Sequence, residues 1–370
     1  MSEDRSLAPA APTPRCRPGW SAGLASLLLG GLCMVGCVTE QEALQSDGRA
    51  PQLVWPMPPA APRFVYQTTL RSSADIIPVD RTQRLKTLLT GGAERVARMT
   101  KPHSVAAGDG RVYVSDTVAR CVHVFDARRG RYFAFGLRRE GRLVKPLGLT
   151  LDAAGQVYVA DASARRVVMF DALGLYLGSF GDDSILQRPT DVTVSADGSR
   201  VYVADVGGVE SDRHQVVAFD RAGRVLFRIE GRGAGPGQLN LPVSLALAGD
   251  GTLYVLEAGN FRVQAFDASG RHLRAWGSVG RGFGQFARPK SVAVDRHGRV
   301  YVADAAFGNV QVFDASGRLL LPVGRAARED RPGEYALLGG VSVDAQGFVY
   351  LLDPLFNKID VLRMLDATGT

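Results

Sequence analysis

The 370-residue sequence is poor in the side chains on which disulfide-linked and zinc-dependent proteins depend. It has four cysteines and five histidines in all. No run of five like charges occurs, and the net charge is only +7, so the chain lacks the basic patch typical of a nucleic-acid-binding protein. The hydrophobic content of 46% is nevertheless sufficient for a sizeable core, and we expect one globular domain preceded by a separate front segment.

The apolar run over 20–35 is too short for a membrane-spanning helix. It follows the basic stretch "PRCRPGW" and ends in "MVGC", where Gly36 precedes Cys37. This pattern resembles a bacterial lipoprotein signal, in which the cysteine is acylated and becomes the first residue of the mature protein. We therefore predict a signal peptide over 1–36, lipidation of Cys37 and a membrane anchor. An uncleaved anchor and an ordinary signal peptide are the alternatives.

Lipidation would leave the mature domain with one free cysteine. Cleavage removes Cys16 and Cys33, and the lipid occupies Cys37. Only Cys121 remains, so the domain needs no disulfide.

Between the predicted anchor and the first repeat lie segments of different character. Residues 37–62 are polar and then Pro-rich, which is typical of a tether that ends in an extended run. Residues 63–79 contain the strand-like stretch "RFVYQTTL" and a connector. The apolar spacing of Leu85, Leu88 and Leu89 predicts a short helical segment within 80–100.

Residues 101–370 repeat one pattern six times. A tyrosine between aliphatic residues recurs at intervals of roughly 45 to 50 residues, which is the period of a propeller blade. The tyrosines are Tyr113, Tyr158, Tyr202, Tyr254, Tyr301 and Tyr350. An acidic residue follows each of them three positions later, namely Asp116, Asp161, Asp205, Glu257, Asp304 and Asp353.

Each repeat predicts four short strands. In the fifth repeat they are "SVAVD", "RVYVAD", "VQVFD" and "RLLLPV", which alternate apolar and polar residues and are separated by turn residues. Six such units predict an all-β fold, a six-bladed β-propeller with four-stranded antiparallel blades. The last repeat has little room for a fourth strand, so we expect the strand at 63–70 to complete the sixth blade and close the ring.

The repeats resemble those of the NHL-repeat family. The resemblance is carried by "GPGQLNLPVSLAL…GTLYVLEAGNFRVQAFDASGRHLRAWG" and "GFGQFARPKSVAV…GRVYVADAAFGNVQVFDASGRLL", and it extends over about 51–365. The lead-in "VWPMPPAAPRFVYQ" looks like that of bacterial six-bladed NHL lipoproteins. Such propellers mostly bind proteins or other ligands, and some relatives are enzymes, so the resemblance implies a fold more than a function. The resemblance to lipoproteins of this type also suggests a multihaem cytochrome system as a partner, although this sequence has no haem-binding Cys-x-x-Cys-His motif.

The six repeated acids invite a catalytic interpretation, since they look like a ring of carboxylates. Catalysis requires two groups that converge on one substrate with separated pKa values. An acid at the end of every second strand is better explained as a cap that accepts hydrogen bonds from the backbone of the following turn.

The sequence offers no clear cofactor or metal site. The glycine-rich stretches 231–237 and 280–286 are followed by strands, whereas a dinucleotide-binding loop opens a helix. A catalytic zinc site needs three convergent ligands, and His103 is the one histidine at the start of a predicted inner strand. The amidating lyases that share the propeller fold use histidines in their channel, and that constellation is absent. We therefore predict neither a cofactor nor a bound metal.

One face of the propeller remains as a candidate site. The starts of the inner strands and the turns between the second and third strands share this face, together with the insertion 206–214. It would carry Lys101, His103, Lys145, Arg188, Asp191, Arg288 and Lys290. These residues predict a mildly basic surface for an acidic partner or an anionic ligand, and the plainer alternative is an ordinary solvated surface.

These observations together favour a non-catalytic scaffold for an envelope protein or assembly. The alternatives are a metal-dependent hydrolase or lyase that works in the mouth of the propeller, and a binder of an anionic polymer such as a glycan or lipopolysaccharide. Val38 follows the predicted lipidated cysteine and lacks the aspartate that commonly retains lipoproteins at the inner membrane. We therefore expect the domain in the periplasm or at the cell surface, anchored to the outer membrane.

Overall fold

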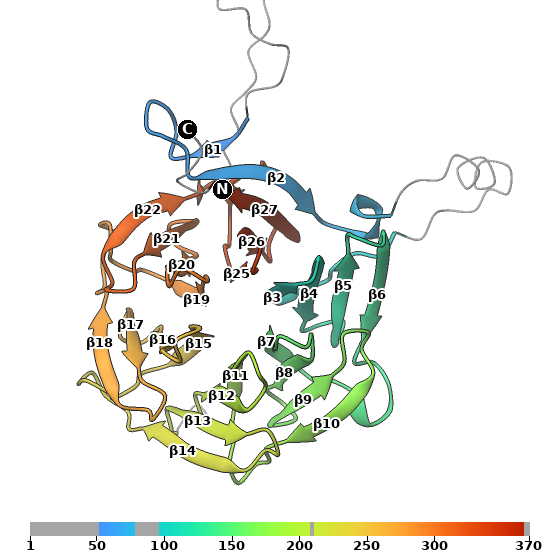
Figure 1. Cartoon of the computed structure of the whole chain (residues 1–370), viewed down its shortest axis with the longest axis vertical. Helices are drawn as coiled ribbons and strands as arrows, with labels where there is room; N and C mark the ends of the chain where they lie inside the picture. The colour runs from blue at the N-terminus through green and yellow to red at the C-terminus, as the bar shows by residue number, and fades with distance from the viewer. Residues whose placement is uncertain (1–51, 78–95, 208–210, 366–370) are drawn as a thin grey trace, which may run out of the picture. The chain divides into compact units, whose positions relative to one another are not determined.

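The computed structural model describes residues 52–77, 96–207 and 211–365. The chain divides into two units, Met1–Arg49 and Ala50–Thr370, and the described residues belong to the second. They form six blades arranged in a ring (Figure 1). The predicted fold class, an all-β six-bladed propeller with four-stranded antiparallel blades, is confirmed. The predicted lipidation site and signal peptide lie outside the described residues.

In each of the first five blades the strands follow one another outward from the centre of the ring. Blade one contains β3 (Pro102–Gly108), β4 (Arg111–Asp116), β5 (Cys121–Asp126) and β6 (Arg131–Phe135). Blade two contains β7 (Pro146–Leu151), β8 (Val157–Asp161), β9 (Arg166–Phe170) and β10 (Tyr176–Phe180). Blade three contains β11 (Pro189–Val194), β12 (Arg200–Asp205), β13 (Gln215–Asp220) and β14 (Val225–Glu230).

The remaining blades continue the same order. Blade four contains β15 (Pro242–Leu247), β16 (Leu253–Glu257), β17 (Arg262–Phe266) and β18 (His272–Trp276). Blade five contains β19 (Pro289–Val294), β20 (Val300–Asp304), β21 (Asn309–Phe313) and β22 (Leu319–Val323). The short pair β23 (Arg325–Ala326) and β24 (Glu334–Tyr335) then leads to blade six.

Blade six joins the two ends of the described chain. It is built from β25 (Gly340–Val343), β26 (Phe348–Asp353), β27 (Lys358–Met364) and, as the next strand outward, β2 (Phe64–Leu70). The closing strand predicted at 63–70 is therefore confirmed. A two-residue strand, β1 (Val54–Trp55), pairs with β2 and lies within the stretch expected to be a tether.

The helical elements of the described residues are two 3-10 turns, η1 (Ser73–Asp75) and η2 (Arg139–Gly141). The helical segment predicted within 80–100 lies mostly outside the described residues and stays a prediction.

The repeated tyrosine fills the gap between one blade and the next. Tyr113 of blade one packs with Leu149 and Val159 of blade two, and Tyr350 of blade six packs with Val112 of blade one. The other four tyrosines occupy the equivalent clusters. A large aromatic ring is suited to a wedge-shaped gap because it buries much apolar area with few rotatable bonds. The sequence repeat is therefore the repeat of this interface.

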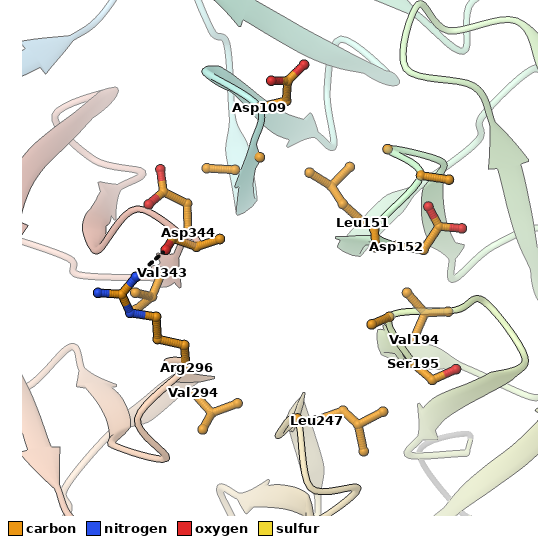
Figure 2. A pocket seen from close by; sticks show the side chains of 18 of the residues that line it. Asp109, Leu151, Asp152, Val194, Ser195, Leu247, Val294, Arg296, Val343 and Asp344 are labelled. Carbon is orange, nitrogen blue, oxygen red and sulfur yellow. Dashed lines mark hydrogen bonds between the residues drawn. The ribbon is translucent and has the colours of Figure 1, made fainter.

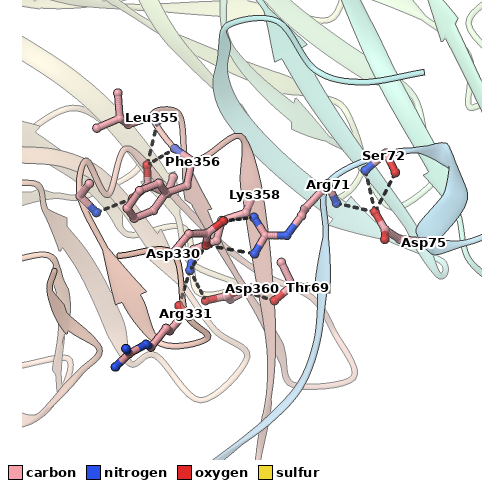
Figure 3. Close-up of polar contacts among 12 residues, drawn as sticks. Thr69, Arg71, Ser72, Asp75, Asp330, Arg331, Leu355, Phe356, Lys358 and Asp360 are labelled. Carbon is pink, nitrogen blue, oxygen red and sulfur yellow. Dashed lines mark hydrogen bonds and ion pairs between the residues drawn. The ribbon is translucent and has the colours of Figure 1, made fainter. Parts of the chain in front are cut away.

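A buried polar cluster links β2 to the rest of blade six (Figure 3). Lys358 of β27 has no exposed side-chain surface, and its Nζ donates to the Arg331 carbonyl at 2.5 Å and lies 3.4 Å from Asp360. Thr69 of β2 donates to Asp360 at 2.6 Å. Asp330 lies 3.3 Å from the Lys358 ammonium and also pairs with Arg71, directly after β2. The N-terminal strand is thus held by ionic contacts as well as by its backbone ladder.

Antiparallel pairing gives the ring two distinct faces. Every inner strand begins at one face, which we call the start face, and ends at the other, which we call the end face. The loops that follow the second and fourth strands of a blade lie at the start face. The turns that follow the first and third strands lie at the end face. The central channel, a lumen of about 180 Å³ between the inner strands, connects the two.

Candidate functional site

The six repeated carboxylates are buried and hydrogen-bonded to backbone at the start face. Each has no accessible surface. Asp353 is representative, because it accepts from the backbone of Ala336 and Leu337 before its inner strand and of Leu355 and Phe356 after its second strand. The equivalent backbone contacts to the connector before the inner strand are made by Asp116, Asp161, Asp205, Glu257 and Asp304. Each acid therefore ties two neighbouring loops together.

This capping also positions the basic residues of the start face. The backbone N–H groups of Lys101, Lys145 and Arg288 each donate to the carboxylate of their own blade, at 2.9, 2.9 and 3.0 Å. Proline follows each of these residues and fixes the start of the inner strand. The backbone that carries the basic side chains is therefore rigid, and less ordering is needed when a ligand binds.

Four cationic or titratable side chains lie at the start-face end of the channel, which we call the basic mouth. They are Lys101, His103, Lys145 and Lys290. Desolvation within the channel mouth lowers the pKa of His103 to about 4, and the positive charges of Lys290, Lys145 and Lys101 act in the same direction. His103 has solvent-accessible surface, yet protein atoms surround its imidazole on several sides. This combination is expected for a side chain inside a lumen.

The pKa of Lys290 is lowered for similar reasons. Desolvation, followed by the nearby Arg288 guanidinium, lowers the pKa of this lysine. A local excess of positive charge that no carboxylate fully balances favours the approach of an anion. The same charges would repel a metal cation.

Of the three other predicted face residues, Arg288 lies near Lys290, whereas Arg188 and Asp191 do not belong to the basic mouth. Arg188 is exposed on the start face before β11. Asp191 is buried below the face, just after the bulge in the ladder between β11 and β12. It accepts from the backbone of Leu245 in blade four at 2.8 Å, and desolvation raises its pKa to about 6. Asp191 therefore links blades and lines the lumen.

The structure adds an apolar component that the sequence interpretation missed. Large hydrophobic side chains are exposed on the loops of the start face, and we call them the apolar collar. They are Phe283 (78% exposed), Val279 (66%), Leu355 (63%), Val118 (57%) and Leu241 (42%). The sequence does contain an indication of this, since Val279 and Phe283 lie in or beside the glycine-rich stretch 280–286, where regular strand packing does not cover an apolar side chain. Aromatic and aliphatic anchors near charged groups are typical of protein-binding surfaces.

The described part of the chain contains no group of three or more His, Cys, Asp and Glu side chains placed to hold a metal ion. Within 52–77, 96–207 and 211–365, no helix has the length and apolar character needed to cross a membrane.

We expect the His103 imidazole to titrate with a midpoint near pH 4, and we expect the midpoint to rise in Lys290→Gln because one repelling charge is removed. Since folding lowers this pKa from 6.5, the contribution of His103 to stability is complete above about pH 6.5 and is lost as the pH falls toward 4. NMR titration of the His103 ring signals measures the midpoint. A midpoint near 6.5 in the wild type would show that this side chain is neither desolvated in the channel nor close to the lysines.

Comparisons with known proteins support the fold and leave the family open. No family model matches the chain, and no curated protein matches it. The NHL-repeat resemblance therefore stays a prediction.

Solved structures do match. A gluconolactonase from Xanthomonas campestris is 19% identical over 81% of this chain and 98% of that chain, with a TM-score of 0.54. The hydrazine synthase of Kuenenia stuttgartiensis is 15% identical over 75% of this chain and 87% of that chain, with a TM-score of 0.54. An inactive virginiamycin B lyase from Staphylococcus aureus, solved with quinupristin, is 14% identical over 72% and 96%, with a TM-score of 0.52.

The chain shares the six-bladed propeller fold of these proteins. At such low identity the likeness extends to the fold alone, and function has to be argued from the site.

Proposed function

We propose that this propeller is a non-catalytic binding scaffold whose start face takes an acidic protein partner. The observation that carries the proposal is that three lysines act on His103 at the same face that exposes the large side chains of the apolar collar. A carboxylate-rich segment of a partner would reach the basic mouth while its apolar residues cover Phe283 and Val279. An anionic polymer such as a glycan would use the charges and leave the apolar collar exposed, so the collar favours a protein.

The proposal extends to cellular context. A lipid on Cys37 would hold the scaffold at a bacterial membrane with the propeller in the periplasm or at the cell surface, and its partner would be an envelope protein. The support for this is the sequence pattern that ends in Gly36 and Cys37.

A second candidate is a hydrolase or lyase that works in the channel. Its support is the shifted pKa of two channel groups, lowered for His103 and raised for Asp191, because perturbed pKa values cluster at catalytic sites. The gluconolactonase and lyase among the structural neighbours are consistent with it. The lysines and the apolar collar lie outside this explanation, which is why it ranks second.

The scaffold proposal is tested by site-specific photocrosslinking in the native cells. A photoreactive phenylalanine analogue at Phe283 is expected to capture one acidic envelope protein, and the same analogue at Leu173 on the end face is not. Leu173 is a matched control because its side chain is 66% exposed. The purified partner should then bind the purified propeller with an affinity that falls as salt rises.

Charge reversal at the mouth is the decisive variant. Lys290→Glu is expected to weaken partner binding by at least roughly tenfold, since it places like charges together at the interface. Arg221→Glu, an exposed residue on the end face, should leave it unchanged. Equal capture at both photoreactive positions, or binding indifferent to Lys290→Glu, contradicts the proposal. Turnover of a lactone that Asp191→Asn abolishes would move the enzyme to first place.

A further inference from the structure

The opposite end of the channel has a different chemical character. Near the end of each inner strand an aliphatic residue occupies the same register position, and these residues surround a cavity of about 840 Å³ at the end face. Figure 2 shows their side chains grouped around the lumen. We call this cavity the apolar cup, and its ring consists of Ala107, Leu151, Val194, Leu247, Val294 and Val343.

The cup is only partly used by the core. Leu151, Leu247, Val294 and Val343 pack against the clusters between blades yet remain partly exposed to the cavity. The aliphatic side chains of the ring offer water no hydrogen-bonding partner, so displacement of water from them by an apolar group is favourable. The volume lies within the range of roughly 300 to 1,000 Å³ that small-molecule sites occupy.

The carboxylates at the rim of the cup are already engaged. Asp344 accepts from the backbone of Gln346 and Phe348 and from the Tyr350 hydroxyl, all at 2.9 Å. Asp295 is likewise satisfied by its own turn, by Arg299 and by Tyr301. Asp152 accepts from Gln156 and Tyr158, and Asp109 pairs with Arg128. These acids stabilise the turns at the rim through their own hydrogen bonds and ion pairs.

Arg296 is different. Its exposed side chain crosses the rim from blade five to blade six, where Nη1 donates to the Ala345 carbonyl at 3.3 Å and Nε contacts the His297 ring at 3.1 Å (Figure 2). A guanidinium has five N–H donors, so these two contacts leave donors for a ligand. Among the charged groups that line the cup, Arg296 is the one whose pairing capacity is not consumed by a neighbouring carboxylate.

We propose that the apolar cup binds a small amphipathic carboxylate, with its hydrocarbon body inside the aliphatic ring and its carboxylate on the Arg296 guanidinium. Charge-assisted pairing of arginine with a carboxylate is strong and directional, and it fixes the orientation of the ligand at the rim. The site is at the other end of the channel from the basic mouth, so it does not depend on the scaffold function.

Decanoate is the probe, with decanol and decylammonium as uncharged and oppositely charged analogues. Isothermal titration calorimetry on the purified propeller is expected to show saturable binding of one decanoate per chain, with a negative heat-capacity change from apolar burial. Decanol should bind more weakly, and decylammonium more weakly again. Absence of saturable binding, or equal affinity for decanoate and decylammonium, overturns the proposal.

Two variants separate the parts of the site. Arg296→Gln is expected to weaken decanoate binding by roughly tenfold and leave decanol unchanged, because only the ionic hydrogen bonds are lost. Val294→Thr keeps the shape of the side chain but adds a hydroxyl to the ring, so it should weaken both ligands. Arg221→Gln removes an exposed arginine from the same face outside the cup and should change neither. Unchanged decanoate affinity in Arg296→Gln or in Val294→Thr overturns the proposal.

Discussion

Gly148→Ala is expected to destabilise the propeller by about 3 kcal/mol or more, an unusually large effect for one added methyl group. Gly148 lies in the inner strand of blade two, where a Cβ would be 1.9 Å from Asp191 Oδ1 and 2.5 Å from Asp191 Cα in blade three. The carboxylate cannot swing aside freely, because it accepts from the backbone of Val192 and Leu245. The Cα atom of Asp191 belongs to the main chain of β11, so no side-chain rotation can relieve this contact. The two blades themselves must therefore separate.

Thermal unfolding followed by circular dichroism measures the effect, and Gly249→Ala is the matched control. Gly249 lies in the turn between β15 and β16, and nothing is within 4 Å of its hypothetical Cβ. The control should change stability by no more than about 0.5 kcal/mol. If Gly148→Ala melts with the wild type, then blades two and three do not approach each other as closely as the structure shows.

The close approach of Gly148 to Asp191 illustrates what could be predicted from the sequence. The period of the chain was visible because every blade must fill the same wedge with the same tyrosine, as Tyr113 and Tyr350 do. The closing strand was visible because the last repeat is one strand short. The period is a property of each single repeat, and the closing strand follows from the number of strands in the last repeat. The packing of Gly148 on Asp191 joins two repeats, and no pattern within either one indicates it.

The same distinction applies to the candidate site. Register alone predicted that Lys101, His103, Lys145 and Lys290 lie at one face. The action of the three lysines on the His103 imidazole depends on the closure of the ring. Asp191 was assigned to that face because it lies at the start of an inner strand, and the structure places it in the lumen wall.

The apolar cup was missed for a related reason. Its members are ordinary strand aliphatics, and only the arrangement of six blades around one axis turns them into a cavity. Sequence repeats therefore reveal the blade, whereas the sites at the two ends of the channel are properties of the assembled ring.

The closure of the ring provides the second large expected effect. Lys358→Met should cost about 3 to 5 kcal/mol, because removal of one partner leaves a buried charge uncompensated. Lys358 and Asp360 are both 0% exposed, so Asp360 would lose the ammonium 3.4 Å away without gaining contact with water. The ammonium also lies 5.0 Å from the centre of the Tyr335 ring, and a methionine would keep most of the packing but none of the charge.

The double variant Lys358→Met/Asp360→Asn makes this argument specific. Neutralising Asp360 removes the uncompensated charge, so the double variant should recover part of the loss, and the coupling between the two positions can be measured by a double-mutant cycle. Arg224→Met is the control for loss of a surface cation, because its side chain is 82% exposed and its pair with Asp220 should contribute under about 1 kcal/mol. Hydrogen exchange should locate the damage in β2, since Thr69 is held by Asp360. A double variant no more stable than Lys358→Met, with β2 amides protected as in the wild type, would mean that the ladder between β2 and β27 closes the ring without help from this ionic cluster.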